Sequence, residues 1–189
     1  HTFQAMSYTI EVYRGHQTAE KHFWIYALYV MFFPQMVAGP IERPQNMLHQ
    51  FHDKKYFDSV KFISGLRLML WGFFKKLVIA DRAAIVSDQV FGSPQQYGTL
   101  AIVWASIMFA FRIYCDFSGY TDIARGAARM MGFELMVNFK RPYLSCSVTE
   151  FWRRWHISLS SWFKDYLYIP LGGSKGGTWM KVRNTFIIF

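Results

Sequence analysis

The residues best suited to chemistry lie in one nine-residue stretch that holds Trp152, Arg153, Arg154, His156 and Ser160. Burial and nearby cations both lower the pKa of a histidine, so His156 is expected to be neutral near pH 7 and able to accept a proton. A structural histidine fits the same pattern. The two arginines suit the phosphates of an acyl donor or, equally, lipid headgroups.

One helix is expected to carry these residues. Ser147 and Glu150 form a capping-box pattern, and Pro170 with the following glycine pair provides the stop. At helical spacing His156 lies at the rim of an apolar stripe. That stripe consists of Trp152, Trp155, Leu159, Trp162 and Tyr166, and the opposite face of Arg154, Ser158, Ser161 and Asp165. For Asp165 we expect a local salt bridge with Lys164 or a neighbouring arginine. The helix is too polar to span a membrane, so we place it at the interface or in a re-entrant cavity.

A second group of polar residues interrupts an apolar run. Asp116 and Asp122 follow an uncharged stretch, and each has an arginine at helical spacing, Arg112 and Arg125. Unpaired charges at membrane depth are costly. We therefore expect Arg112 to pair with Asp116, and Asp122 to face protein or a polar cavity. Pairing within the helix and a polar lining for a donor or acceptor channel both explain these residues.

The same region carries small residues that would let helices approach closely. They are Gly119, Gly126 and Gly132, with Ala124, Ala127 and Ala128.

The composition indicates a membrane protein. Of 189 residues 52% are hydrophobic, 20% are aromatic and only 17% are charged, against about 25% in soluble domains. Apolar runs at 23–39, 62–80 and 98–116, the last extending to about 130, suit membrane spans of about 20 residues. Proline and glycine break the first run. The expected fold is all-α: a polytopic multi-helix bundle with broken or re-entrant helices, forming a single membrane domain over 1–189.

Other patterns exclude several functions. The net charge is +9, but the basic residues occur as pairs beside apolar runs, which favours a lipid surface and excludes nucleic acid as a partner. His49 and His52 have helical spacing without a third ligand, so no metal site is expected. The loop Gly172–Gly177 lacks the spacing of a phosphate loop. Because the chain starts at His1 and ends within an apolar run, we expect it to be truncated at both ends.

Four sequence blocks together resemble the membrane-bound O-acyltransferase family, on its bacterial polysaccharide O-acetylase branch. The last block contains the run Glu-Phe-Trp-Arg-Arg-Trp-His-Ile-Ser-Leu-Ser. The blocks cover nearly the whole chain: Thr2–Gly15, Phe33–Arg43, Tyr114–Ala124 and Glu150–Gly173. The resemblance implies a multi-pass enzyme of the bacterial inner membrane. It also implies that His156 is one of two recurring histidines, the second lying in a downstream Trp-His-Gly block, so that this piece alone is inactive.

The implied reaction is transfer of an acetyl group toward a hydroxyl of an extracytoplasmic polysaccharide such as alginate, directly or through a partner acetyltransferase. No bound cofactor is expected; the donor is acetyl-CoA or an acyl-carrier thioester. Trp152, Arg153, Arg154, Ser160, Asp116 and Asp122 are candidates for the donor or substrate channel. The competing interpretation is a transporter or channel with broken helices around buried charges. It accounts for Asp116 and Asp122 but not for the cluster around His156.

Overall fold

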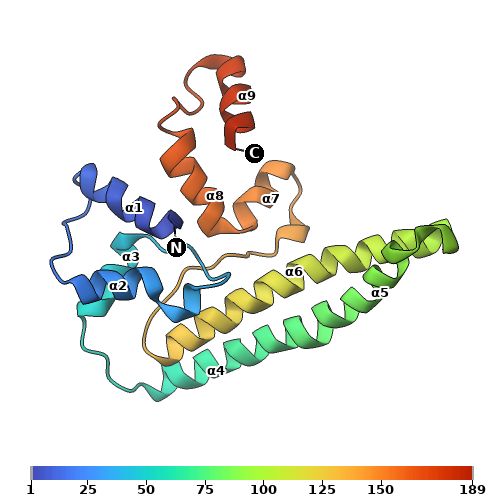
Figure 1. Cartoon of the computed structure of the whole chain (residues 1–189), viewed down its shortest axis with the longest axis horizontal. Helices are drawn as coiled ribbons and strands as arrows, with labels where there is room; N and C mark the ends of the chain where they lie inside the picture. The colour runs from blue at the N-terminus through green and yellow to red at the C-terminus, as the bar shows by residue number, and fades with distance from the viewer. Residues whose placement is uncertain (1, 189) are drawn as a thin grey trace. The chain divides into compact units, whose positions relative to one another are not determined.

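The computed structural model describes residues 2–188, in which the regular elements are all helices (Figure 1). The all-α class is therefore confirmed. The α-helices are α1 Thr2–Tyr13, α2 Phe23–Met31, α3 Pro44–His52, α4 Ser59–Phe73, α5 Asp81–Gly92, α6 Thr99–Met130, α7 Val148–Arg154, α8 Ile157–Phe163 and α9 Gly177–Ile188. Two π-helical segments, Phe74–Ala80 and Lys164–Tyr168, continue α4 and α8, and short 3-10 turns cover Phe33–Gln35, Pro94–Gln96 and Pro142–Leu144.

The chain forms two compact units. The hairpin unit comprises residues 34–39 and 55–135, and the terminal unit comprises 2–33, 40–54 and 136–188. Among the described residues one helix, α6, is long and apolar enough to cross a membrane, and Phe23–Gln35 is a shorter apolar helical stretch. The predicted run at 98–130 is thus one continuous helix. The membrane spans expected at 23–39 and 62–80 remain predictions. In the first of them α2 ends at Met31, and Pro34 lies in a short 3-10 turn after it.

The hairpin unit packs α4, the π-helical segment and α5 along α6 (Figure 1). Gly65 faces Gly126, and Gly72 faces Gly119, so the two helices touch at crossing points seven residues apart. A methyl group added at Gly126 would lie 2.6 Å from the Gly65 carbonyl oxygen. Close approach was predicted for Gly119 and Gly126 and is confirmed. Gly132, predicted with them, instead follows the end of α6 beside the Lys55 side chain.

This packing gives a first testable result. Gly126→Ala should lower the thermal midpoint in detergent by several degrees, because overpacking a tight contact costs about 1–3 kcal/mol. Gly92→Ala is the matched control, since a methyl group there meets nothing within 4 Å. Equal midpoints for the two variants would contradict the close contact.

The terminal unit holds α8 and its π-helical extension against α1 and α3. Trp162 is buried, and its indole N–H donates to the Phe3 carbonyl at 3.1 Å. The Tyr166 hydroxyl donates to Glu11 at 2.9 Å, and the Gln45 amide donates to the same carboxylate at 2.5 Å. Burial raises the pKa of Glu11, but its hydrogen bonds with Tyr166, His16 and Gln45 outweigh that effect and lower it. Glu11 of the first sequence block and Tyr166 of the last sequence block thus belong to one buried hydrogen-bond network.

Candidate active site

The segment around His156 consists of two short helices rather than one. Ser147 caps α7 as expected, accepting from the Glu150 N–H at 3.1 Å. Glu150 accepts in turn from the Cys146 N–H at 2.8 Å and pairs with Arg154. The helix ends at Arg154, because Trp155 is extended and His156 has a left-handed backbone with φ 41° and ψ 56°.

The expectation of one continuous helix is therefore wrong, because the chain breaks at Trp155 and His156. The left-handed residue interrupts the 3.6-residue repeat, so one helical stripe does not describe the burial of the whole segment. Ser158, expected on the polar face, is fully buried, while Trp152 is 39% exposed. Trp162 and Tyr166 are buried, as the stripe predicted. His156 occupies the N-cap position of α8 rather than the rim of a continuous helix.

His156 lines a largely apolar cavity of about 380 Å³. The remaining lining residues are Trp152, Trp155, Leu159, Ser160, Phe163, Lys164, Tyr168, Thr185 and Ile188. Phe139 stacks on the imidazole with ring centroids 6.5 Å apart and packs edge-on against Trp155 at 5.0 Å. The Ser160 hydroxyl donates to the Trp155 carbonyl at 3.2 Å, across the break. These contacts present the histidine ring to an apolar space.

Burial lowers the pKa of His156 to about 4, so the imidazole is neutral at pH 7. Neutrality was predicted, although from burial and neighbouring cations together; burial is the cause here. A ring with this pKa is unprotonated throughout the physiological range, and it can accept a proton from a group that becomes acidic as it reacts.

The low pKa predicts how stability changes with pH. The unfolded chain binds a proton at His156 below about pH 6.5, whereas the folded chain does so only near pH 4. Stability from this group is therefore complete above pH 6.5 and declines as the pH falls toward 4. The difference in thermal midpoint between wild type and His156→Asn should shift against wild type between pH 6.5 and 4.5. A difference independent of pH across this window would contradict the burial.

A second cavity, of about 590 Å³, shares Trp152, Ser160, Lys164 and Thr185 with the first. It is also lined by Val148, Thr149, Arg153, Ile157 and Ser161. Arg153 and Lys164 bring two positive charges to its wall. Arg154, also predicted for the site, is engaged with Glu150 and with the Arg141 carbonyl. The structure thus groups Trp152, Arg153, His156 and Ser160 and assigns Arg154 to the packing of α7.

The carboxylates predicted for the channel lie in the hairpin unit. Asp116 pairs with Lys76 at 2.6 Å and Arg112 pairs with Asp88, so the expected Arg112–Asp116 pair is wrong. Asp116 contacts the π-helical segment and Arg112 contacts α5, so each pairs with another element rather than with a residue one turn away. Asp165 likewise pairs with Arg43 at 2.9 Å, not with Lys164 or a nearby arginine.

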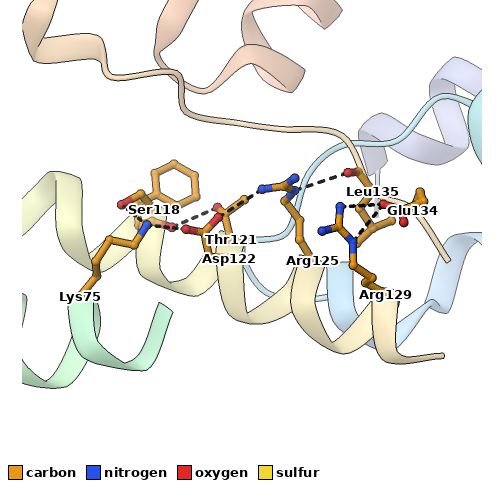
Figure 2. A network of polar contacts seen from close by, with 9 residues as sticks. Lys75, Ser118, Thr121, Asp122, Arg125, Arg129, Glu134 and Leu135 are labelled. Atoms are coloured by element: carbon orange, nitrogen blue, oxygen red, sulfur yellow. Dashed lines mark hydrogen bonds and ion pairs between the residues drawn. The ribbon is translucent and has the colours of Figure 1, made fainter. Parts of the chain in front are cut away.

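Asp122 faces protein, as predicted. Lys75 donates to it at 2.6 Å and to Ser118 at 3.1 Å, and Arg125 lies 3.3 Å from its other oxygen (Figure 2). Arg125 also reaches the Leu135 carbonyl at 3.4 Å. Lys75 lies in the π-helical segment, an irregularity that often occurs at functional sites. These ion pairs explain why charges are tolerated beside the apolar part of α6.

Two residues of the site were missed as functional candidates. Asn138 and Phe139 lie in a connector without regular structure, where no periodic pattern marks them. Asn138 is fully buried beside the start of α8, and Phe139 stacks on His156. A signal existed only in composition: an asparagine and an aromatic residue just before the Lys140–Arg141 pair.

Comparison with known proteins identifies the class. Residues 15–189 match the model of the membrane-bound O-acyltransferase family, and the chain belongs to this family. The resemblance inferred from the four sequence blocks is thus confirmed.

Individual relatives are also similar. The chain is 45% identical over 186 residues to a probable alginate O-acetylase, AlgI, of Pseudomonas putida, covering 98% of this chain and 38% of that protein. It is 41% identical to a peptidoglycan O-acetyltransferase of Helicobacter pylori, covering 89% and 32%. It is 28% identical to a teichoic acid D-alanyltransferase of Streptococcus thermophilus, covering 90% and 42%. The chain therefore spans less than half the length of these relatives.

Proposed function

We propose that the protein is a multi-pass O-acyltransferase of the bacterial inner membrane. It transfers an acetyl group from a thioester donor toward a hydroxyl of an extracytoplasmic polysaccharide, directly or through a partner acetyltransferase. The observation that carries this proposal is a neutral histidine on an apolar cavity in a chain of this family. The named activities of the relatives, acetylation of alginate and of peptidoglycan, support the same class of acceptor.

The chemistry follows from the properties of His156. The acceptor hydroxyl oxygen attacks the thioester carbonyl carbon while the imidazole takes the hydroxyl proton. The tetrahedral intermediate then collapses, the carbon–sulfur bond breaks, and the proton passes from the imidazolium to the leaving thiolate. The products are an ester and a free thiol. Exclusion of water by the aromatic wall protects the thioester from hydrolysis.

Cells provide the test of this function. Deleting the gene should remove acetyl esters from the extracytoplasmic polysaccharide, and the wild-type gene should restore them. Unchanged acetyl content in the deletion strain would reject the acyltransferase proposal. Loss of polymer export with normal acetylation of the residual polymer would instead favour the transporter interpretation.

We further propose that Arg153 and Lys164 hold a phosphate group of the donor, acetyl-CoA or a carrier's pantetheine arm. Both line the second cavity, which adjoins the His156 cavity through shared residues, so a donor can place its acyl end and its anionic end in neighbouring spaces. Phosphate groups are well matched by such cations.

The double variant Arg153→Gln/Lys164→Gln should raise the apparent KM for the donor by about tenfold or more, as expected for losing charged hydrogen bonds. The variant Lys175→Gln/Lys181→Gln removes the same charge elsewhere in the terminal unit and should leave KM unchanged. Assays with acetyl-CoA and with an acetylated carrier protein separate the two donors. An unchanged KM for both donors in the first variant would contradict this assignment.

A further inference from the structure

The backbone of His156 is unusual and needs an explanation. His156 adopts the left-handed conformation, which is energetically unfavourable for any residue other than glycine. Such a conformation persists only where the surrounding structure imposes it. His156 is also the N-cap of α8, yet its side chain makes no capping hydrogen bond. The first amide groups of α8 must therefore find acceptors elsewhere.

Asn138 supplies those acceptors from outside the helix. The Ile157 N–H donates to the Asn138 backbone carbonyl at 2.9 Å, and the Ser158 N–H donates to its side-chain oxygen at 3.1 Å. On the other side of the break, the Lys140 N–H donates to the Arg154 carbonyl at 2.9 Å. The connector thus fixes the backbone immediately before and immediately after the Trp155–His156 break.

The Asn138 side chain is well placed for this task. Asn138 and Ser158 are both fully buried, so water does not compete for the hydrogen bond between them. Phe139, the next residue, stacks on the imidazole. One short segment therefore sets both the backbone conformation of His156 and the plane of its ring.

We propose that Asn138 is a positioning residue that caps α8 in place of the histidine and so holds His156 toward the cavity. The proposal rests on the proposed role of His156 in acyl transfer. Its structural part, the restraint on His156, stands independently of that role. The side-chain oxygen is the atom that matters, since it accepts the Ser158 amide proton.

The test compares Asn138→Leu, which removes the acceptor at similar size, with Asn138→Asp, which keeps it. The control is Asp58→Ala, which removes a side chain that caps α4 in the hairpin unit through the Val60 and Lys61 N–H groups. Each variant of the full-length protein is assayed for acyl transfer, thermal midpoint and the rate at which diethyl pyrocarbonate modifies each histidine. His16 and His52, with side chains 63% and 48% exposed, serve as references within the same sample.

We expect Asn138→Leu to reduce transfer at least about tenfold and to speed modification of His156 about fivefold, the factor by which losing a cap shifts a helix start. His16 and His52 should react as in wild type. Asn138→Asp should retain most of the acyl transfer, and its His156 should be modified as slowly as in wild type. Asp58→Ala should change neither the transfer nor the rate of His156 modification.

Three results would overturn the proposal. One is wild-type transfer and His156 reactivity in Asn138→Leu. Another is an Asn138→Asp variant as impaired as Asn138→Leu. The third is accelerated modification of all three histidines, which would make Asn138 a general folding residue. If His156→Asn retains transfer, the proposed role of His156 fails, whereas the change in His156 reactivity still tests the restraint.

Discussion

Replacing His156 with asparagine is expected to lower acyl transfer at least about a hundredfold, because a positioned general base typically contributes 10²–10⁴-fold. Asparagine tolerates the left-handed backbone better than other residues with a side chain, so the variant should keep the fold of the segment. The measurement is the rate of ester formation by membranes that contain equal amounts of wild-type and variant protein.

The stability of other His156 variants separates chemistry from folding. His156→Gly should have a higher thermal midpoint than His156→Ala, because alanine keeps the strain of φ 41° and glycine removes it. All three variants should lose transfer alike. Transfer that follows the thermal midpoint from variant to variant would show that His156 acts only through the fold.

Removing the carboxylate of Asp122 is expected to have the largest effect on stability. Asp122→Leu leaves Lys75 and Arg125 without the anion that both contact, and breaking a buried pair costs about 3–5 kcal/mol. The Lys75 and Asp122 side chains are only 9% and 17% exposed, so water replaces little of the loss. We expect a large fall in the thermal midpoint in detergent.

Two further variants test whether the loss of stability comes from the buried charges. Adding Lys75→Met to Asp122→Leu should recover part of the loss, since it removes one uncompensated charge. Asp88→Asn is the control, because its pair with Arg112 is largely exposed and should contribute less than about 1 kcal/mol. Equal effects of Asp88→Asn and Asp122→Leu would contradict the buried network.

The helical class, the long α6 and the cap of α7 could be predicted because each rests on a local pattern. Apolar length predicts α6, and the spacing of Ser147 and Glu150 predicts the start of α7. The small size of the glycines on α6 predicted close helix contact, though not that Gly65 and Gly72 would be the partners.

The break at His156 could not be predicted, because nothing in its own sequence forbids a continuous helix there. The start of α8 is defined by hydrogen bonds that the Ile157 and Ser158 N–H groups donate to Asn138, which lies twenty positions before Ser158 in the sequence. The predictions of ion pairs were wrong for the same reason. Local spacing predicted a pair between Arg112 and Asp116, but in the fold Asp116 pairs with Lys76 and Arg112 pairs with Asp88. Asp165 was likewise paired by Arg43 from a distant element.

The most direct test follows a labelled acetyl group in vesicles that contain the purified full-length protein. Labelled acetyl thioester, as acetyl-CoA or acetylated carrier, is supplied outside, and acceptor polysaccharide with any required partner acetyltransferase is enclosed. We predict that label appears on the enclosed polymer as a base-labile ester with wild-type protein, and that His156→Asn abolishes it. Equal ester formation by the wild type and the His156→Asn variant would contradict the account.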